Sequence, residues 1–561
     1  MLYVFYVGLT MTRKELQQTI SNLTTEIESV ADDRVRSIQK TLLNLLEYVI
    51  SENDKLKEEN QKLRDENHRL KGEKGKPSIR KQSNGNSKHS SESERKPRGK
   101  NKKKKSKKKK DKIKIDRTEV CEADLSTLPS DVEFKGYQSV VVQDITIQTD
   151  NIEFKKQIYY SPSLKKTYIA PLPDGYQGEF GPHVKAFILD LHHNGKMTES
   201  AIHTILTNHG IKISTATVSR VLTERLEVFH KEKKDIVSAG LSSSKYQQMD
   251  DTGARVKGKN YYTHILCNHL YTAFFTRPRK DRLTILDILT QGEIGFCFNE
   301  SAYDLMVHMK LPEKSLRLLK YRVRQEMMTR SEVDKILKEL FPNQKKHTTN
   351  RRVILEASAI VAYQKSEHAV EILLTDDAPQ FKQITDLLAL CWVHDGRHYK
   401  KLRPIISKHR DILEAFLSQY WDYYHKLLDY KKHPTSELCK SLGDEFDVLF
   451  STITGYEQLD ERIMKTKLKK ESLLLVLKHP VLPLHNNSSE LGARIQARYR
   501  DISFHTINEK GTEAKDTFMT IGSTAKKLMV NSYQYILDRV SKKFEMPSLA
   551  SLIENSSPSP G

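Results

Sequence analysis

Five carboxylates of this chain stand where a strand or a helix is expected to begin or end. The stretch MDDTGAR places Asp250 and Asp251 at the end of a strand-like run, and AVEILLTDDAPQF places Asp376 and Asp377 after a buried-looking strand. HNNSSELGAR places Glu490 in the first turn of an expected helix. Carboxylate oxygens suit Mg²⁺, and two such ions can promote in-line phosphodiester chemistry. The residue types therefore permit a metal site that acts on a phosphodiester.

Each acidic segment also has an ordinary structural explanation. DDTG is a good turn sequence, and TDDAP is a common exit from a strand into a loop. The spacing from Asn487 to Glu490 matches a capping box, in which Glu490 would only satisfy the end of its own helix. No short regular interval links the three segments, so spacing alone does not assemble them.

Two further groups near these segments could bind a ligand. Cys391 and His394 have the spacing of half a zinc site, but no second Cys/His pair is evident, which favours structural roles. Arg494 and Arg498 follow Glu490 at helical spacing. They could pair with carboxylates or face DNA phosphates, and we favour DNA.

The N-terminal part of the chain is expected to form a coiled coil over residues 14–73. Asparagines and leucines each recur every seven residues, with the leucines three after the asparagines, and Leu42, Leu46 and Val49 continue the pattern upstream. Asn at a and Leu at d favour a parallel dimer in fixed register. The predicted dimer contacts are Asn53, Leu56, Asn60, Leu63, Asn67 and Leu70.

A basic tract dominates the charge of the chain. Residues 95–114 contain 14 Lys or Arg and one Asp, and so supply +13 of the net charge of +21. Such a tract is a solvated arm first and a sequence-independent phosphate-binding arm second. Its central lysines are Lys102, Lys103, Lys104, Lys105, Lys107, Lys108, Lys109 and Lys110. They lie in a linker, 74–117, for which the composition predicts disorder.

Residues 181–238 are expected to form a helix-turn-helix region, because a helix, a turn at Gly210 and a Ser-capped helix follow one another. An ordinary three-helix bundle fits this segment about as well, but the zipper and the Lys tract favour DNA binding. The residues predicted to face a major groove are Ser214, Thr215, Thr217, Ser219 and Arg220.

The whole chain is expected to be a multidomain α/β protein with helical insertions. The predicted segments are a disordered or over-extended start (1–13), a small irregular β-containing segment (118–180), a first core part (240–390) with a helical insertion at about 295–365, a second insertion (391–478), the last core part (479–545) and a disordered tail (546–561). No apolar run approaches the roughly 20 residues of a membrane span, and five scattered cysteines favour a reducing cytoplasm.

From about residue 38 to 545, the chain resembles the large transposases of the insertion sequence 66 family, a branch of the DDE recombinases with an RNase H-like core. The resemblance rests on four ordered motifs, MDDTGARV, TDDAPQF, CWVHDGRHYKKL and HNNSSELGAR, and on GSTAKKLMVNSYQYILDRV near the C-terminus. His485 and Leu491 depart from the family pattern. Only Cys121 lies where the family often has a Cys-rich zinc segment, so no zinc is predicted there.

The resemblance implies a catalytic and metal-binding triad of Asp250, Asp376 and Glu490, with Asp251 and Asp377 as alternates. It also matches four accessory residues, which are Asn486, Asn487, His394 and Arg397. The implied cofactor is a pair of Mg²⁺ or Mn²⁺ ions.

The resulting hypothesis is a bacterial, cytoplasmic and nucleoid-associated transposase that acts on element ends and target DNA, as a homodimer and with small accessory proteins of the same element. The alternative is a catalytically inactive or domesticated DNA-binding dimer. A plain RNase H-like nuclease would not require a dimerising coil.

Overall fold

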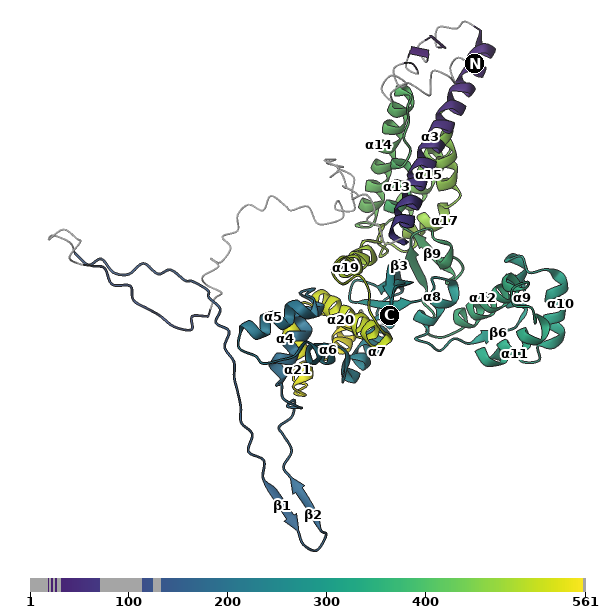
Figure 1. Cartoon of the computed structure of the whole chain (residues 1–561). Coiled ribbons are helices and arrows are strands. Elements are labelled where there is room, and N and C mark those ends of the chain that lie inside the picture. Colours follow the sequence, from purple (N-terminus) through teal and green to yellow (C-terminus); the bar gives the residue numbers. More distant parts are fainter. Residues whose placement is uncertain are drawn as a thin grey trace.

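The computed structural model describes residues 19, 22–23, 26–27, 32–70, 114–124 and 133–557 (Figure 1). A mixed five-stranded sheet forms its centre, in the order β5-β4-β3-β8-β9. The strands are β3 (Tyr246–Val256), β4 (Lys259–Cys267), β5 (Thr272–Arg277), β8 (Ile372–Thr375) and β9 (Leu387–Leu390). The first three pair antiparallel, and β8 and β9 run parallel to β3. The predicted α/β class is confirmed, with many helices around one mixed sheet.

Helices from the two ends of the core cover this sheet. They are α7 (Glu227–Ser242), α19 (Asn487–Ser503) and α20 (Glu509–Lys527). Side chains of α20 at helical spacing accept hydrogen bonds from backbone N–H groups of the edge strand β5: Asp516 from Thr276 at 2.5 Å, and Thr520 from Phe274 at 3.1 Å. The edge is thereby closed to pairing with another strand.

A helical insertion separates β5 from β8. Its elements are α8 (Arg282–Leu289), β6 (Phe296–Cys297), α9 (Glu300–His308), α10 (Glu313–Arg322), β7 (Met327–Met328), α11 (Arg330–Leu340) and α12 (Thr348–Gln364). The lobe extends sideways from the sheet in Figure 1, and α12 returns the chain to the core.

A second, larger helical insertion follows β9. Its helices are α13 (Trp392–Lys400), α14 (Ser407–Tyr430), α15 (Ser436–Leu449), α16 (Glu457–Lys467), α17 (Lys470–Leu473) and α18 (Leu475–Lys478). Trp392 is fully buried at its centre, and its ring contacts those of Tyr420, Tyr423 and Phe446. This aromatic cluster gives the insertion its own core, separate from the one beneath the sheet.

The N-terminal helix α3 (Asp33–Leu70) lies against this second insertion (Figure 1). Leu46, which the heptad pattern assigns to a dimer seam, packs with Leu43 and Ile50 against Ile405 and Ile406 of the same chain. Further along the helix the predicted seam is open to solvent, with Asn53, Leu56, Asn60 and Leu63 exposed, and the helix continues through Asn67 to Leu70. Dimerisation through this helix stays a prediction.

The region expected to bind DNA consists of α4 (Pro182–His193), α5 (Glu199–Asn208) and α6 (Thr215–Thr223), ahead of α7. Two C-terminal helices complete the packing: α21 (Ser532–Val540) lies on α4, and α22 (Leu549–Ser556) lies on α7. The sequence predicts a disordered tail from residue 546, which is wrong for α22. Leu549 and Ile553 are fully buried, so burial of apolar side chains holds this short helix in place.

A β-hairpin, β1 (Ile158–Ser161) and β2 (Lys166–Ile169), projects from the body (Figure 1). Within the described ranges, no helix is long and apolar enough to cross a membrane. The lysines predicted to bind DNA between Lys102 and Lys110 lie outside the described residues.

Candidate functional site

The sheet register brings Asp250 and Asp376 together. Gln248 of β3 is the parallel partner of Leu374 of β8, and the two aspartates each lie two residues further along their chains. Because side chains alternate with a period of two and neighbouring strands are about 4.8 Å apart, both aspartates lie on the same face. Two carboxylates distant in sequence therefore become neighbours at the end of β8.

Asp250 is held in an environment that disfavours its charge. Burial raises the pKa of this carboxyl to about 7, and the nearby charges of Asp376, Asp251 and Glu490 act in the same direction. The backbone N–H of Asp251 donates to Oδ1 of Asp250 at 2.8 Å, which acts in the opposite direction. A site that gathers negative charge in this way favours a cation or a proton.

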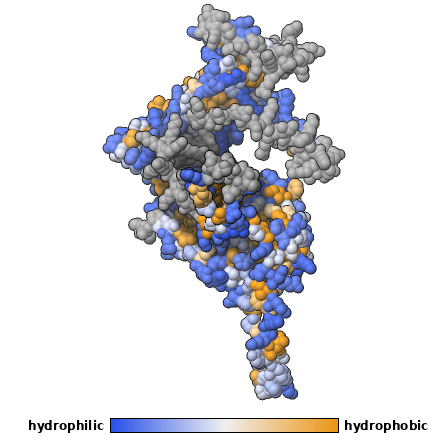
Figure 2. All heavy atoms as spheres, turned by 90° about the vertical axis from the view of Figure 1, so that its left-hand side faces the viewer, coloured by the Kyte–Doolittle hydropathy of each residue, from blue (hydrophilic) through white to orange (hydrophobic). Residues whose placement is uncertain are grey.

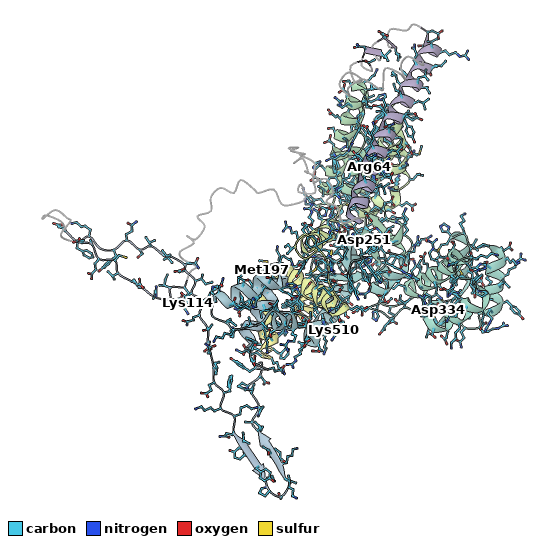
Figure 3. All side chains as sticks on the ribbon, in the orientation of Figure 1. Arg64, Lys114, Met197, Asp251, Asp334 and Lys510 are labelled. Atoms are coloured by element: carbon cyan, nitrogen blue, oxygen red, sulfur yellow. The ribbon has the colours of Figure 1, made fainter. Side chains whose placement is uncertain are left out.

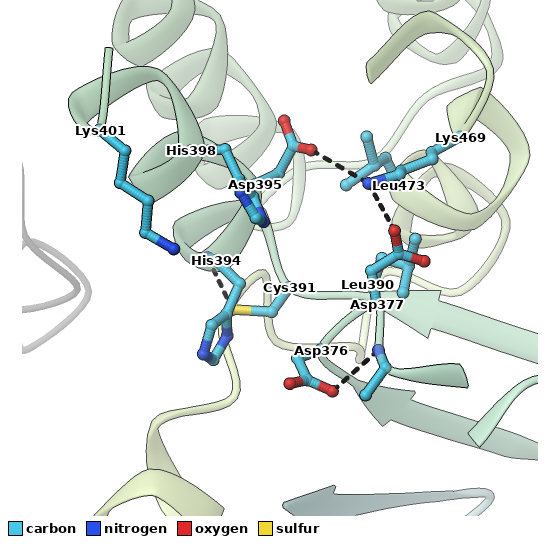
Figure 4. Close-up of a pocket in the computed structure, with 11 residues that line it drawn as sticks. Asp376, Asp377, Leu390, Cys391, His394, Asp395, His398, Lys401, Lys469 and Leu473 are labelled. Carbon is cyan, nitrogen blue, oxygen red and sulfur yellow. Dashed lines mark hydrogen bonds and ion pairs between the residues drawn. The ribbon is translucent and has the colours of Figure 1, made fainter. Parts of the chain in front are cut away.

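Asp376 occupies a similar environment, one residue beyond β8. Burial raises the pKa of its carboxyl, a hydrogen bond from the backbone N–H of Ala378 (3.1 Å) lowers it, and the charge of Asp251 contributes a rise. In Figure 4, Asp376 and Asp377 point in opposite directions from the same turn. The two adjacent aspartates therefore have different surroundings.

Lysines neutralise Asp377, one of the two alternates. Its carboxylate contacts Nζ of Lys469 at 2.7 Å and Nζ of Lys382 at 3.0 Å. Burial opposes the charge of Asp377, but these two hydrogen-bonded lysines lower the pKa of the carboxyl overall. Lys469 also reaches Asp395 at 3.7 Å, which ties Asp377 to the second insertion (Figure 4).

The other alternate, Asp251, is also held by neighbouring side chains. It accepts a hydrogen bond from Nε2 of Gln380 at 2.6 Å and lies 3.4 Å from Nζ of Lys280. Its side chain is 10% exposed. Asp251 and Asp377 are thus both occupied by cationic or amide partners, and Asp250 and Asp376 have no such side-chain partner among the described residues.

Glu490 lies in the first turn of α19 and is held by residues of α13. Nη2 of Arg397 donates to both of its carboxylate oxygens, at 2.9 and 3.1 Å. Nε2 of His394 lies 3.6 Å from Oε1 of Glu490. The capping-box alternative is wrong, because the helix begins after Asn486 and the carboxylate of Glu490 is directed to Arg397.

Cys391 connects these elements. Its Sγ accepts hydrogen bonds from the backbone N–H groups of His394 (3.4 Å) and Asn486 (3.2 Å), so it caps α13 and fixes the start of α19. Burial raises the pKa of the Cys391 thiol to about 12. This placement agrees with a structural role for the cysteine. Asn487 is the first residue of α19, and its N–H donates to His485 Nδ1 at 3.3 Å.

Asn486 anchors α19 to the strand that carries Asp250. Its fully buried side chain donates from Nδ2 to the carbonyl of Met249 at 2.7 Å. Its Oδ1 is also buried and has no hydrogen-bond partner in the described part of the chain. A buried acceptor without a partner is costly, so this oxygen favours a ligand that provides a donor or a positive charge.

The donor set fits a hard divalent cation, since it consists of carboxylate and amide oxygens. Within the described residues, however, no group of three or more His, Cys, Asp or Glu side chains is close enough to hold a metal ion. Glu490 is the member that is turned elsewhere, toward Arg397 and His394. Burial, with the charge of Arg397, lowers the pKa of His394 against the opposing effect of Glu490.

The residues expected to contact DNA are distributed over two helices. Ser214 caps α6 by accepting from Thr217 N–H at 3.2 Å, and Arg220 donates to the Thr217 hydroxyl at 3.0 Å. Ser214, Thr215 and Arg220 are exposed, whereas Ser219 lines a cavity between α6 and the end of α19. Groove binding through this helix stays a prediction.

Arg494 and Arg498 follow Glu490 along α19 and are both exposed. In the part of the chain that the structure describes, neither forms an ion pair with a carboxylate. The alternative that they serve only as partners of nearby acids therefore has no support. Their guanidinium groups remain accessible to a polyanion.

The sequence did not predict the side chains that bind only one aspartate of each adjacent pair, which are those that contact Asp251 and Asp377. Gln380 lies four residues after Asp376, but Lys280 and Lys469 are distant in sequence and their roles depend on tertiary contacts. It also missed Glu47, a buried carboxylate of α3 that accepts from the backbone N–H of Ile406 at 3.1 Å and contacts Nδ1 of His409 at 2.6 Å.

Comparison with known proteins identifies the family. Residues 177–299, from the loop before α4 to the start of α9 and including Asp250, match the family model described as Transposase IS66 family. The chain is 30% identical over 317 residues to an uncharacterised protein, y4jO, of Sinorhizobium fredii (strain NBRC 101917 / NGR234). That similarity covers 54% of this chain and 94% of the relative. The chain belongs to the IS66 family of transposases.

Proposed function

We propose that this protein is a DDE transposase that cleaves DNA at the ends of a mobile element and joins them to target DNA. The observation that carries the proposal is the parallel register of β3 and β8, which sets Asp250 beside Asp376 in a chain of this family. Glu490 lies close enough for its charge to contribute to the raised pKa of Asp250. The mixed sheet, in which β3 carries Asp250 and β8 leads into Asp376, supports an RNase H-like core.

In this proposal Asp250, Asp376 and Glu490 hold two divalent ions, Mg²⁺ or Mn²⁺. When bound, such ions would stabilise the charge that develops on the attacking and leaving oxygens of the phosphodiester. Asp376 is preferred to Asp377, because Lys382 and Lys469 already neutralise Asp377.

Neighbouring residues would prepare the triad. Arg397 holds the carboxylate of Glu490 at the start of α19, and Nε2 of His394 accepts a hydrogen bond from Arg397 at 3.1 Å. Asn486 fixes that helix to the strand of Asp250. The exposed guanidinium groups of Arg494 and Arg498 would contact DNA phosphates beside the site.

Other parts of the chain would bind and pair the DNA ends. The α4–α6 region and the basic tract would hold terminal DNA, and the exposed half of α3 would join two protomers. Small accessory proteins of the same element remain part of the proposal, as the family resemblance implies.

A matched pair of substitutions tests the proposed triad. Asp376→Asn and Asp377→Asn each replace one aspartate by its amide at adjacent positions. Because Asp377→Asn also removes the partner of Lys382 and Lys469, the melting temperature and DNA affinity of both variants are measured beside cleavage. We expect Asp376→Asn to reduce Mg²⁺-dependent cleavage of an end-bearing duplex by at least about 100-fold, and Asp377→Asn to reduce it by less than about tenfold. The reverse order would assign the second carboxylate to Asp377. Binding of ends without cleavage by the wild-type protein, with any divalent ion, would favour the inactive DNA-binding alternative.

A further inference from the structure

The β1–β2 hairpin is open to solvent on both of its faces. Its register pairs Ile158 with Ile169 on one face and Tyr159 with Tyr168 on the other. The exposed fractions of these side chains are 65, 55, 65 and 45% respectively. A two-stranded hairpin with no covered face is marginally stable in water, so the exposed ribbon indicates a surface that a partner covers.

The charge of the hairpin identifies the chemistry of that partner. Between Phe154 and Pro173 there are four lysines and three tyrosines, and there is no Asp or Glu. The lysines are Lys155, Lys156, Lys165 and Lys166, and all are exposed. Nζ of Lys166 lies 5.3 Å from the ring centroid of Tyr168. A uniformly basic and aromatic ribbon fits a polyanion with flat or grooved surfaces.

The base of the hairpin is fixed although its tip is free. Ala170 N–H donates to the carbonyl of Gln157 at 2.9 Å, which extends the pairing beyond the strands. Phe154 and Tyr176 make an edge-to-face contact with ring centroids 5.0 Å apart. Nζ of Lys185, on α4, donates to the carbonyl of Gln177 at 2.8 Å. These contacts hold the ribbon beside the α4–α6 region while it projects outward.

The projection is visible from two directions. In Figure 2 the narrow lower part of the molecule carries both hydrophobic and hydrophilic residues on its surface. Figure 3 shows side chains leaving both edges of the ribbon without reaching the rest of the body. The hairpin is thus a projecting arm, and its strands do not pair with the central sheet.

We propose that the β1–β2 hairpin is a DNA-contacting arm that lies in a groove of duplex DNA held by this protein. A two-stranded β-ribbon fits the major groove, which is about 12 Å wide. The four lysines contact phosphates on the strands that border the groove, and the tyrosines contact sugars and base edges. The inference rests on the proposed function for the identity of its partner, and it adds a DNA contact to those proposed for the α4–α6 region, the basic tract and the arginines of α19.

The test measures DNA affinity of the full chain in a chelating buffer, with a fluorescent duplex carrying the element's flanking end and a scrambled duplex of the same composition. One variant replaces the four hairpin lysines by alanine. The control variant replaces four exposed lysines of the first insertion by alanine, which are Lys335, Lys338, Lys345 and Lys346. Both variants have the same net charge, and neither set of lysines is buried.

We expect the hairpin lysine variant to bind both duplexes at least about tenfold more weakly. The slope of log affinity against log salt concentration should become shallower by about 0.9 for each phosphate that the variant no longer neutralises. The control variant should stay within about twofold of wild type. A second hairpin variant, Tyr159→Ala with Tyr168→Ala, should weaken binding with an unchanged salt dependence. Equal weakening in the hairpin and control lysine variants, or unchanged affinity in the hairpin lysine variant, would overturn the proposal.

The binding assay separates this inference from the proposed function, because it needs no catalysis. Weakened binding by the hairpin lysine variant supports the arm even if the wild-type protein never cleaves DNA. Unchanged binding by that variant overturns the arm even if cleavage is robust and depends on Asp250.

Discussion

Replacing Asp250 by Asn should stabilise the protein at neutral and alkaline pH in the absence of divalent ions. The pKa of Asp250 is raised from 3.8 to about 7, first by burial and then by the neighbouring carboxylates. The folded state therefore favours the protonated carboxyl. Stability contributed by protonation is fully present below pH 3.8 and is lost as the pH rises through 7.

The expected magnitude follows from this shift. The rise in the pKa of Asp250 from 3.8 to about 7 lowers the free energy of unfolding by about 4 kcal/mol above pH 7. At pH 5 the loss is about 2 kcal/mol, because the carboxyl would be ionised in the unfolded state but is still mostly protonated in the folded state. Asn is uncharged at every pH and keeps an oxygen that can accept from the backbone N–H of Asp251. Asp250→Asn should therefore raise the melting temperature by several degrees at pH 8, and by clearly less at pH 5.

The assay is thermal unfolding in chelating buffer, with wild type and variant compared at both pH values. Asp235→Asn provides the control, because this residue is an exposed carboxylate on α7. The control should change the melting temperature little at either pH. A variant less stable than wild type at pH 8, or a gain of equal size at pH 5 and pH 8, would refute the electrostatic reasoning.

Three further predictions concern the residues that position the site. Arg397→Ala should reduce cleavage by about 10- to 100-fold, because Glu490 loses its bidentate partner. DNA affinity should stay within about twofold of wild type. Equal losses in affinity and cleavage would contradict a positioning role for Arg397. Gly492→Ala should lower the melting temperature, since the new Cβ would lie 2.8 Å from Cγ2 of Ile265, at a cost of about 1–3 kcal/mol. Ile265→Ala destabilises by itself because Ile265 is fully buried, but Gly492→Ala should cost less in that background than in wild type; an equal cost in both backgrounds would exclude this contact as the cause. Glu47→Ala should speed amide hydrogen exchange at the start of α14, because the substitution leaves the N–H of Ile406 without its acceptor. Unchanged exchange there would show that α3 does not pack against the second insertion in solution.

The local patterns of the sequence located the candidate acidic residues but not their partners. The apolar run before Asp376 predicts a buried strand, and its end places the carboxylate at the edge of the sheet, as observed for β8. The family resemblance already prefers Asp376 to Asp377. The physical reason for that preference involves Lys469, which lies far along the chain and reaches Asp377 only through packing of the second insertion. Such contacts leave no regular spacing in the sequence.

The heptad pattern of α3 illustrates a different limit. Periodicity predicts a helix with an apolar stripe, and that helix is present. Periodicity does not specify what covers the stripe, and Leu46 packs on Ile405 and Ile406 of the same chain. The sequence predicts a small irregular β-containing segment over residues 118–180, and the β1–β2 hairpin lies within it. The exposure of the hairpin on both faces is a tertiary property that the sequence does not predict.

We propose that Asp250, Asp376 and Glu490 form a site for metal-dependent DNA cleavage and joining. The most direct test is Mg²⁺-dependent 3′-end cleavage and strand transfer on DNA carrying the element's own ends, with accessory proteins of the element added. Wild type is compared with Asp250→Asn and Glu490→Gln. Both substitutions should abolish cleavage and joining while binding of the ends stays intact. Cleavage that survives both substitutions would contradict the proposal.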